Sequence, residues 1–161
     1  MALNPYATSG MLVYVASAAV TTEPANAAAY AALTWTQIGN VRSFSAFGDT
    51  QNIINAPVVG DSRVRKVAGS RDAGNVTLTL YPDEGDAGQL ALIAAALTSS
   101  TYPIRIDYPA ASKLTVGGTV AKRYFVAIVA GGKETPGGNE DIVTVEYTLA
   151  VTTKVTNVVA T

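Results

Sequence analysis

Residues 75–81 read NVTLTLY, and along them apolar side chains alternate with polar ones. Val76, Leu78 and Leu80 fall on one side, which is the pattern of a β-strand that buries one face, because successive side chains of a strand point to opposite faces. Residues 142–151, IVTVEYTLAV, follow the same rule. Their apolar side carries Val143, Val145, Tyr147, Leu149 and Val151. Two such strands predict a β-rich fold.

Segments on either side of these strands also favour extended structure. Further strands are predicted at residues 11–20, 35–47, 102–108 and 123–129. The first and the last of these are apolar on both faces, whereas an antiparallel sheet normally keeps one wet face. A helix, a second sheet or another subunit must therefore cover the second face. Gly39 and Asn40 predict a bulge or bend within the second segment.

One helix is predicted, over residues 87–98, because Asp86 is a favourable N-cap and apolar residues recur behind it at helical spacing. These residues are Leu90, Ile93, Ala94 and Leu97, and we expect this stripe to lie against a sheet. Gly117-Gly118 predicts a two-residue hairpin turn. Residues 22–34 are predicted as a connection, and residues 131–139 as a glycine-rich loop.

Residues 48–74 separate the predicted strands by a long section that we expect to be irregular. Sections of this length are uncommon in compact domains and are usually functional or disordered. This one carries a basic cluster, Arg63, Arg65, Lys66 and Arg71. The order of elements predicts a mainly β fold in a single domain over residues 1–161. We expect an antiparallel β-sandwich or barrel with one packed α-helix, a long inter-strand loop and short terminal arms.

The composition argues against several classes of protein. Of the 161 residues 48% are apolar and only 14% are charged, so we expect other chains to cover much of the surface. The longest apolar stretches are far shorter than the ~20 residues that a membrane-spanning helix needs. No Lys or Arg precedes Arg42, which argues against an export signal. Together with the absence of cysteine, this favours a cytoplasmic protein.

Catalytic and ligand-binding constellations are also missing from the sequence. Histidine is absent, which removes the commonest general base and the commonest metal ligand. The net charge of −1 provides no field that would attract nucleic acid. Gly132-Lys133 is similar to part of a phosphate loop, but Ala127 and Glu134 stand where that motif needs Gly and Ser or Thr. We therefore expect no enzyme, no cofactor and no metal.

The order of these segments resembles that of the tail tube, or major tail, proteins of long-tailed bacteriophages. The resemblance begins with the first strand and WTQIGNV at residues 35–41, and continues through the long loop into AGSRDAGNVTL at residues 68–78. It ends with the acidic turn, the helix and the closing hairpin, and covers about residues 8–153. These proteins are related in fold to the tube proteins of type VI secretion systems and of contractile tails.

The resemblance implies a virion protein that is assembled in the host cytoplasm. Identical copies would form six-membered rings that stack into a hollow tube, and DNA would pass through the lumen without specific binding. The implied partners are the protein itself and other tail proteins such as the tape measure, the tail terminator and the distal tail protein. No membrane is implied.

The resemblance also assigns roles to particular residues. In the family the long loop reaches the adjacent ring, and residues 49–72 occupy that place here. The expected contact residues on this loop are Asp49, Asp61, Arg63, Arg65, Lys66, Arg71 and Asp72. Their possible acidic counterparts are Asp83, Glu84 and Asp86. Residues expected on the core and ring-forming strands are Tyr124, Val126, Ile128, Val143, Val145 and Tyr147.

Simpler explanations stand beside these assignments. The basic cluster also fits a solvated strand edge, because Lys and Arg protect edges from unwanted pairing, while direct DNA binding is disfavoured. The acidic residues also fit turn and capping chemistry. Alternative functions are a secretion-system tube protein or a monomeric β-sandwich binding module, for instance for carbohydrate. Trp35 is the one tryptophan that could serve such a module as a stacking platform.

Overall fold

The structure is a computed structural model that describes residues 9–109 and 120–159. Its strands are β1 (Leu12–Ala16), β2 (Trp35–Ile38), β3 (Val41–Phe44), β4 (Thr50–Ala56), β5 (Arg65–Asp72), β6 (Asn75–Leu80), β7 (Thr101–Asp107), β8 (Lys122–Thr135), β9 (Thr144–Val151) and β10 (Thr156–Val158). Its helices are α1 (Ala27–Ala31) and α2 (Ala87–Ala96). The turn predicted at Gly117-Gly118 lies outside the described residues.

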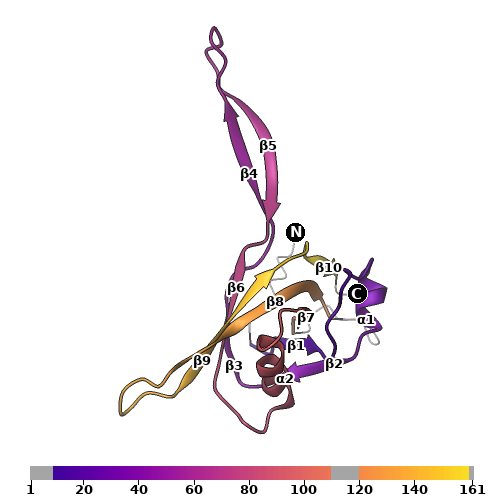
Figure 1. Ribbon diagram of the computed structural model, residues 1–161, viewed down its shortest axis with the longest axis vertical. Coiled ribbons are helices and arrows are strands. Elements are labelled where there is room, and N and C mark those ends of the chain that lie inside the picture. Colours follow the sequence, from indigo (N-terminus) through magenta and orange to yellow (C-terminus); the bar gives the residue numbers. More distant parts are fainter. Residues whose placement is uncertain (1–8, 110–119, 160–161) are drawn as a thin grey trace, which may run out of the picture.

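One curled antiparallel sheet builds the body of the molecule (Figure 1). It has eight strands in the order β2-β1-β7-β8-β9-β6-β3, and β10 pairs with β8. The two edge strands of this order, β2 and β3, are neighbours in the chain and are separated only by Gly39 and Asn40. Asn40 adopts a φ of 56°, a left-handed conformation that asparagine tolerates better than most residues. The predicted bend is confirmed.

This bend carries the chain from one edge of the curled sheet to the other. The sheet is sandwich-like and is not closed into a barrel, since no described ladder joins β2 to β3. Helix α2 lies against the sheet at the lower end of the body (Figure 1). The predicted fold class, a mainly β antiparallel architecture with a packed helix, is confirmed.

The alternating strands bury the side that the sequence predicts. Val76, Leu78 and Leu80 of β6 are at most 1% exposed, and they pack in one core with Phe125 of β8 and Leu149 of β9. Burial of this kind is the main favourable contribution to folding, about 25 cal/mol for each Å² of apolar surface removed from water. The core thus joins strands from both halves of the chain.

Strand β8 is buried on both faces, as its apolar sequence predicts. Its second face contributes Tyr124 and Val126 to a smaller cluster that Tyr30 of α1 completes. The rings of Tyr30 and Tyr124 stack with centroids 5.1 Å apart. Residues 22–34 are therefore not only a connection. They contain a short helix, capped by Asn26, which accepts a hydrogen bond from the Ala29 N–H at 2.9 Å.

The predicted orientation of α2 is wrong. Leu90, Ile93 and Leu97 are 51%, 48% and 85% exposed, and Ala94 is exposed as well. The buried residues are Gly88, Gln89, Leu92 and Ala95. The helix also ends at Ala96 and not at residue 98.

Polar contacts at the start of α2 explain its orientation. The side-chain amide of Gln89 donates to the backbone oxygens of Gly39 and Tyr81, at 3.2 and 2.9 Å. A Cβ on Gly88 would lie 2.1 Å from the backbone oxygen of Gln37, so only glycine lets the helix approach β2 this closely. These contacts outweigh the apolar periodicity, because buried amides need partners.

Two segments predicted as loops contain strands. Within residues 48–74, β4 and β5 pair as an antiparallel hairpin, which projects as an arm from the body (Figure 1). Strand β8 runs to Thr135, so the predicted loop at residues 131–139 begins five residues too early. Gly131, with a φ of 124°, sits in a register shift between Val129 and Gly132, and this irregularity lets the ladder continue past the glycines.

Candidate functional site

The arm formed by β4 and β5 exposes large apolar side chains to solvent. They are Ile53, Ile54, Val58, Val59, Val64 and Val67, each at least 50% exposed. Ile53 and Ile54 are consecutive, so they lie on opposite faces of the hairpin. A two-stranded hairpin alone is marginally stable in water, and exposed apolar surface of this kind marks a contact site. The arm is therefore a candidate surface for another molecule.

The tip of the arm is a tight turn that displays valine. The Asp61 N–H donates to the Val58 carbonyl at 3.1 Å, and Gly60 between them adopts a φ of 100°. Val59, at the first corner position, is 104% exposed. Exposed turns normally use polar or small residues, so the apolar corner makes the tip a candidate for contact with another molecule.

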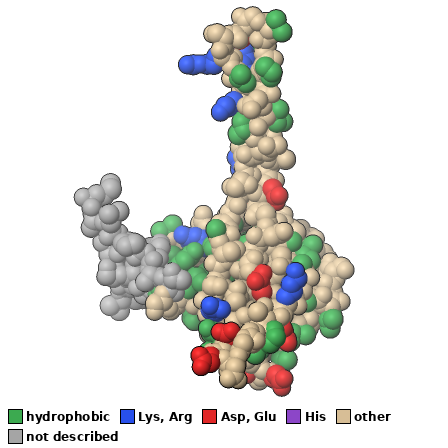
Figure 2. All heavy atoms as spheres, turned by 90° about the vertical axis from the view of Figure 1, so that its left-hand side faces the viewer, with side chains coloured by type: hydrophobic (Ala, Val, Ile, Leu, Met, Phe, Trp, Pro, Cys, Tyr) green, Lys and Arg blue, Asp and Glu red, His purple; other side chains and the backbone are tan. Residues whose placement is uncertain are grey.

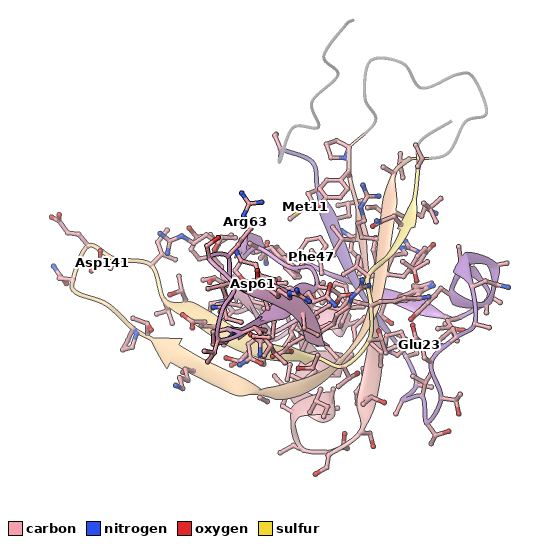
Figure 3. The ribbon with its side chains drawn as sticks, turned by 90° about the horizontal axis from the view of Figure 1, so that it is seen from above. Met11, Glu23, Phe47, Asp61, Arg63 and Asp141 are labelled. Atoms are coloured by element: carbon pink, nitrogen blue, oxygen red, sulfur yellow. The ribbon has the colours of Figure 1, made fainter. Side chains whose placement is uncertain are left out.

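The predicted basic cluster lies on this arm. The Arg65 guanidinium pairs with the Asp61 carboxylate at 3.0 Å, but both side chains are exposed and such pairs contribute little. No ion pair within the described residues engages Arg63, Lys66 or Arg71. Figure 3, which looks down on the arm, shows Arg63 pointing outward beside Asp61. Arg63 and Lys66 of the arm thus offer cations that lie near its valines and have no ion-pair partner among the described residues.

The remaining predicted loop residues lie at the root of the arm. Asp49, Arg71 and Asp72 line a shallow cavity of about 340 Å³ together with Lys154. Asp72 also accepts a hydrogen bond from the Gly74 N–H at 2.9 Å. Asp49 and Asp72 therefore flank the junction with the body, whereas Asp61 lies at the tip.

The acidic turn before α2 is built by local hydrogen bonds. Asp86 accepts from the N–H groups of Gln89 (2.8 Å) and Gly39 (3.2 Å), so the predicted N-cap is confirmed. Asp83 accepts from the Gly85 N–H at 2.9 Å and from the Asn40 side-chain amide at 3.2 Å. Glu84 is exposed. Turn and capping chemistry accounts for Asp83 and Asp86.

The arm and the acidic turn do not meet within one chain. Figure 1 places them at opposite ends of the molecule, and Figure 2 shows basic side chains on the upper arm and several acidic ones at the far end. An ion pair between the two sets would need two copies of the chain.

The predicted core and ring-forming residues occupy different environments. Tyr124, Val126, Val145 and Tyr147 are at most 6% exposed, and Ile128 is half-buried. Val143 precedes β9 and is 38% exposed, because the strand begins at Thr144 and not at residue 142. Tyr124 and Val126 thus make their contacts inside the chain, against α1.

An apolar groove of about 450 Å³, which the sequence did not predict, runs between α2 and the hairpin of β8 and β9. Its walls are Ile93, Ala96 and Leu97 on the helix and Gly131, Gly132, Glu134, Val145 and Tyr147 on the hairpin. Glu134 is its only charged lining residue within the described chain. Burial raises the pKa of Tyr147, and the neighbouring Glu134 carboxylate raises it further.

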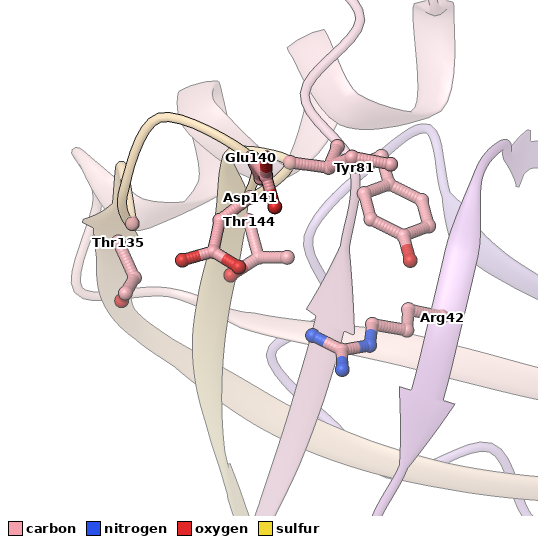
Figure 4. A pocket seen from close by; sticks show the side chains of 8 residues that line it. Arg42, Tyr81, Thr135, Glu140, Asp141 and Thr144 are labelled. Carbon is pink, nitrogen blue, oxygen red and sulfur yellow. The ribbon is translucent and has the colours of Figure 1, made fainter.

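A third cavity, which is polar, lies between β3 and the loop that joins β8 to β9. It measures about 290 Å³. Arg42 extends below the Tyr81 ring toward Thr144 and the loop that carries Glu140 and Asp141 (Figure 4). Asp141 is already engaged by the Gly138 N–H at 2.7 Å. The cavity holds mixed charge without any arrangement of nucleophile and base.

A buried ion pair escaped the sequence reasoning. Arg105 and Asp107 of β7 contact each other at 3.0 Å, with side chains only 15% and 12% exposed. The guanidinium also lies 3.8 Å from the ring centroid of Tyr14, its partner in the β1–β7 register. The i, i+2 spacing in a predicted strand places Arg105 and Asp107 on one face and could have suggested this pair, whereas the contact with Tyr14 depends on strand pairing. It lies beneath the second face of the sheet and serves packing.

The described residues contain neither a metal-binding cluster nor a candidate membrane-spanning helix. Across residues 9–109 and 120–159 there is no group of three or more carboxylate, His or Cys residues placed to hold a metal ion. None of the described helices is long and apolar enough to cross a membrane.

Comparison with protein families identifies a match over nearly the whole chain. The family model described as "Phage tail tube protein, TTP" matches residues 8–160. Comparison with curated proteins gave no match.

Solved structures with a similar fold include chains of a tail tube, a baseplate and a sheath/tube terminator. A chain of the SPP1 tail tube has a TM-score of 0.64 at 14% identity, covering 96% of this chain and 81% of that one. A chain of the anti-feeding prophage baseplate has a TM-score of 0.68 at 11% identity, covering 99% and 98%. A chain of the sheath/tube terminator of an extracellular contractile injection system has 0.67 at 16% identity, covering 98% and 99%. At these identities the likeness concerns the fold.

Proposed function

Because the chain belongs to the phage tail tube protein family, which the match over residues 8–160 shows, we propose that it is the repeating subunit of a hollow phage tail tube. Six copies form a ring, rings stack along the tail axis, and DNA passes through the lumen during delivery to the host. The protein is a structural component of the virion tail. Assembly of the rings takes place in the host cytoplasm before the virion is complete.

The observation that carries this proposal is the β4–β5 arm. Val58 and Val59 are exposed at the end of a hairpin, where contact of apolar surface with water is unfavourable and burial against another chain is favourable. An arm that reaches past the body of its own subunit suits contact with the next ring. Residues 49–72, including the basic cluster, are proposed to form that contact.

Ring closure is a separate contact from stacking. It requires two different patches on the two sides of each subunit, since head-to-tail contacts close into a ring only when the rotation fits. We assign it to the sides of the sheet body, where the edge strands β2 and β3 and the exposed Val143 are available. The tape measure, the tail terminator and the distal tail protein are the proposed further partners at the lumen and at the two tube ends.

An injection-system tube protein is the second candidate. The fold likeness to chains of the anti-feeding prophage and of the contractile injection system favours it, at TM-scores of 0.68 and 0.67. The family match favours the phage tail tube, and both candidates share the tube-forming role. Interaction with phage tail proteins is what distinguishes them.

Shortening the arm tests the stacking role. Deletion of residues 53–68 removes the ladder beyond Gln51 and leaves the strands of the body intact, because β4 and β5 pair only with each other. We expect the variant to melt like the wild type and to form rings that do not stack, as seen by negative-stain electron microscopy. Long tubes from the shortened chain would exclude the arm from stacking.

A further inference from the structure

The groove between α2 and the β8–β9 hairpin is left open in the single chain. The apolar stripe of α2 that faces it, Ile93 and Leu97, is 48% and 85% exposed. Tyr147 and Val145 form the opposite wall and are each 6% exposed. A surface with buried apolar walls and an exposed apolar rim gains most when another apolar group fills it.

The arm supplies a group of suitable size and character. Val59 is fully exposed on a turn that Gly60 makes narrow, so its side chain can enter a cavity of about 450 Å³ without the bulk of the hairpin. Val58 beside it is 50% exposed and adds a second aliphatic contact. Insertion of these two valines into the groove would remove apolar surface on both sides from water.

The charges of the two surfaces are complementary. Residues 50–72 carry four basic residues against two acidic ones, and residues 131–146 carry four acidic residues against one basic one. Arg63, next to the tip, and Glu134, on the groove wall, are both exposed, and neither has an ion-pair partner among the described residues. Opposite charges at matching positions steer and orient association.

The β4–β5 arm projects from one end of the molecule, whereas α2 and the β8–β9 hairpin lie toward the other end (Figure 1). The arm therefore cannot fill the groove of its own chain, whereas the arm of a second copy can. We propose that the arm tip of one subunit seats Val59 in the α2–β8–β9 groove of a subunit in the next ring, with Arg63 facing Glu134. This inference rests on the proposed tube function and names the surface that receives the arm. Because the contact joins unlike patches, it repeats from ring to ring.

The absence of cysteine from the chain makes a cross-linking test direct. We would combine Val59→Cys with Leu97→Cys in one chain, assemble the protein and oxidise it mildly. A disulfide needs Cα atoms closer than about 7 Å, so only a seated tip can form it. The expected result is a ladder of covalent multimers, since each chain then joins the copy above and the copy below.

The matched control pairs Val59→Cys with Leu12→Cys, which is 39% exposed on β1, away from the groove. This control should form tubes without a ladder. Three results would overturn the proposed docking. They are a ladder from the control, test-variant tubes whose chains are not cross-linked after oxidation, and covalent dimers of the single Leu97→Cys variant. Absence of tubes from the wild-type chain would instead contradict the proposed function.

Charge exchange gives a second test that does not depend on cysteine. Arg63→Glu should reduce tube yield roughly tenfold or more, because like charges facing each other at an interface are strongly unfavourable. Glu134→Arg combined with Arg63→Glu should restore the yield. Arg42→Glu, on an exposed cation of β3 that does not line the groove, is the control and should leave the yield unchanged. Failure of the double variant to recover, with both single variants folded, would contradict the assigned pair.

Discussion

Val126 and Val59 are the same residue type in opposite environments, and the contrast shows how position decides the role of a side chain. Val126 is 2% exposed and packs in the cluster that α1 closes over β8. Val59 is fully exposed at the arm tip. One stabilises the folded chain, and the other is available for contact between chains.

Replacing each of these valines with aspartate separates the two roles. Val126→Asp places a charge in an apolar cluster without a partner, and we expect it to lower the free energy of unfolding by about 3 kcal/mol or more. Val59→Asp should change that free energy by less than about 0.5 kcal/mol while preventing tube assembly. Urea unfolding monitored by circular dichroism measures the free energy of unfolding of both variants. Equal stability of the two variants would refute the burial assigned to Val126.

Two glycines near α2 provide a second matched pair. A Cβ on Gly88 would stand 2.1 Å from the Gln37 backbone oxygen, whereas one on Gly85 would meet only the Asp83 carboxylate, at 3.4 Å. Gly88→Ala must therefore push α2 away from β2, at a cost of about 1 to 3 kcal/mol. Gly85→Ala should be close to neutral. Thermal melting compares them, and a neutral Gly88→Ala would mean that α2 does not approach β2 as described.

At the level of elements, alternation was a reliable guide and helical periodicity was not. The alternating strands β6 and β9 bury the faces that their sequences predict, because a period of two leaves little freedom of orientation. Helix α2 has apolar residues nearly all round, so its rotation is decided by Gln89 and Gly88. Their contacts with distant strands are not visible in a local pattern.

The helix face can be checked by truncating one leucine on each side. Leu92→Ala should lower the free energy of unfolding by about 2 to 5 kcal/mol, since its side chain is 0% exposed and its loss leaves a cavity. Leu97→Ala should cost less than about 0.5 kcal/mol, because that side chain is 85% exposed. Chemical denaturation of both variants measures the difference. A larger loss of stability from Leu97→Ala than from Leu92→Ala would instead support the helix orientation that the sequence periodicity predicts.

The arm is a second element whose structure the sequence did not reveal. Its length and basic residues mark it as functional, but its strands are not visible because Ile53 and Ile54 do not alternate with polar neighbours. Pairing of Ile53 with Ala68 and of Ala56 with Arg65 creates a hairpin that the body does not stabilise. The groove on α2 could not be predicted either. It depends on the orientation of α2, which the sequence periodicity predicts wrongly, and on a bulge in β8.

For the whole molecule, the low charge content already predicts association. The chain buries both faces of β8 internally with α1, so the apolar surface left for partners is concentrated on the arm, on α2 and before β9. These regions lie at the ends and sides of the body (Figure 1). Such a distribution suits a subunit that meets several copies of itself, through one kind of contact within a ring and another between rings.

Electron microscopy of the purified full-length chain tests this account most directly. We predict hollow tubes of uniform diameter with a regular axial repeat, and end views with six-fold symmetry. Raising the salt concentration should shorten these tubes, because salt screens the ion pairs between rings. A protein that remains monomeric at high concentration, or that forms closed rings without any stacking when the arm is intact, would contradict the account.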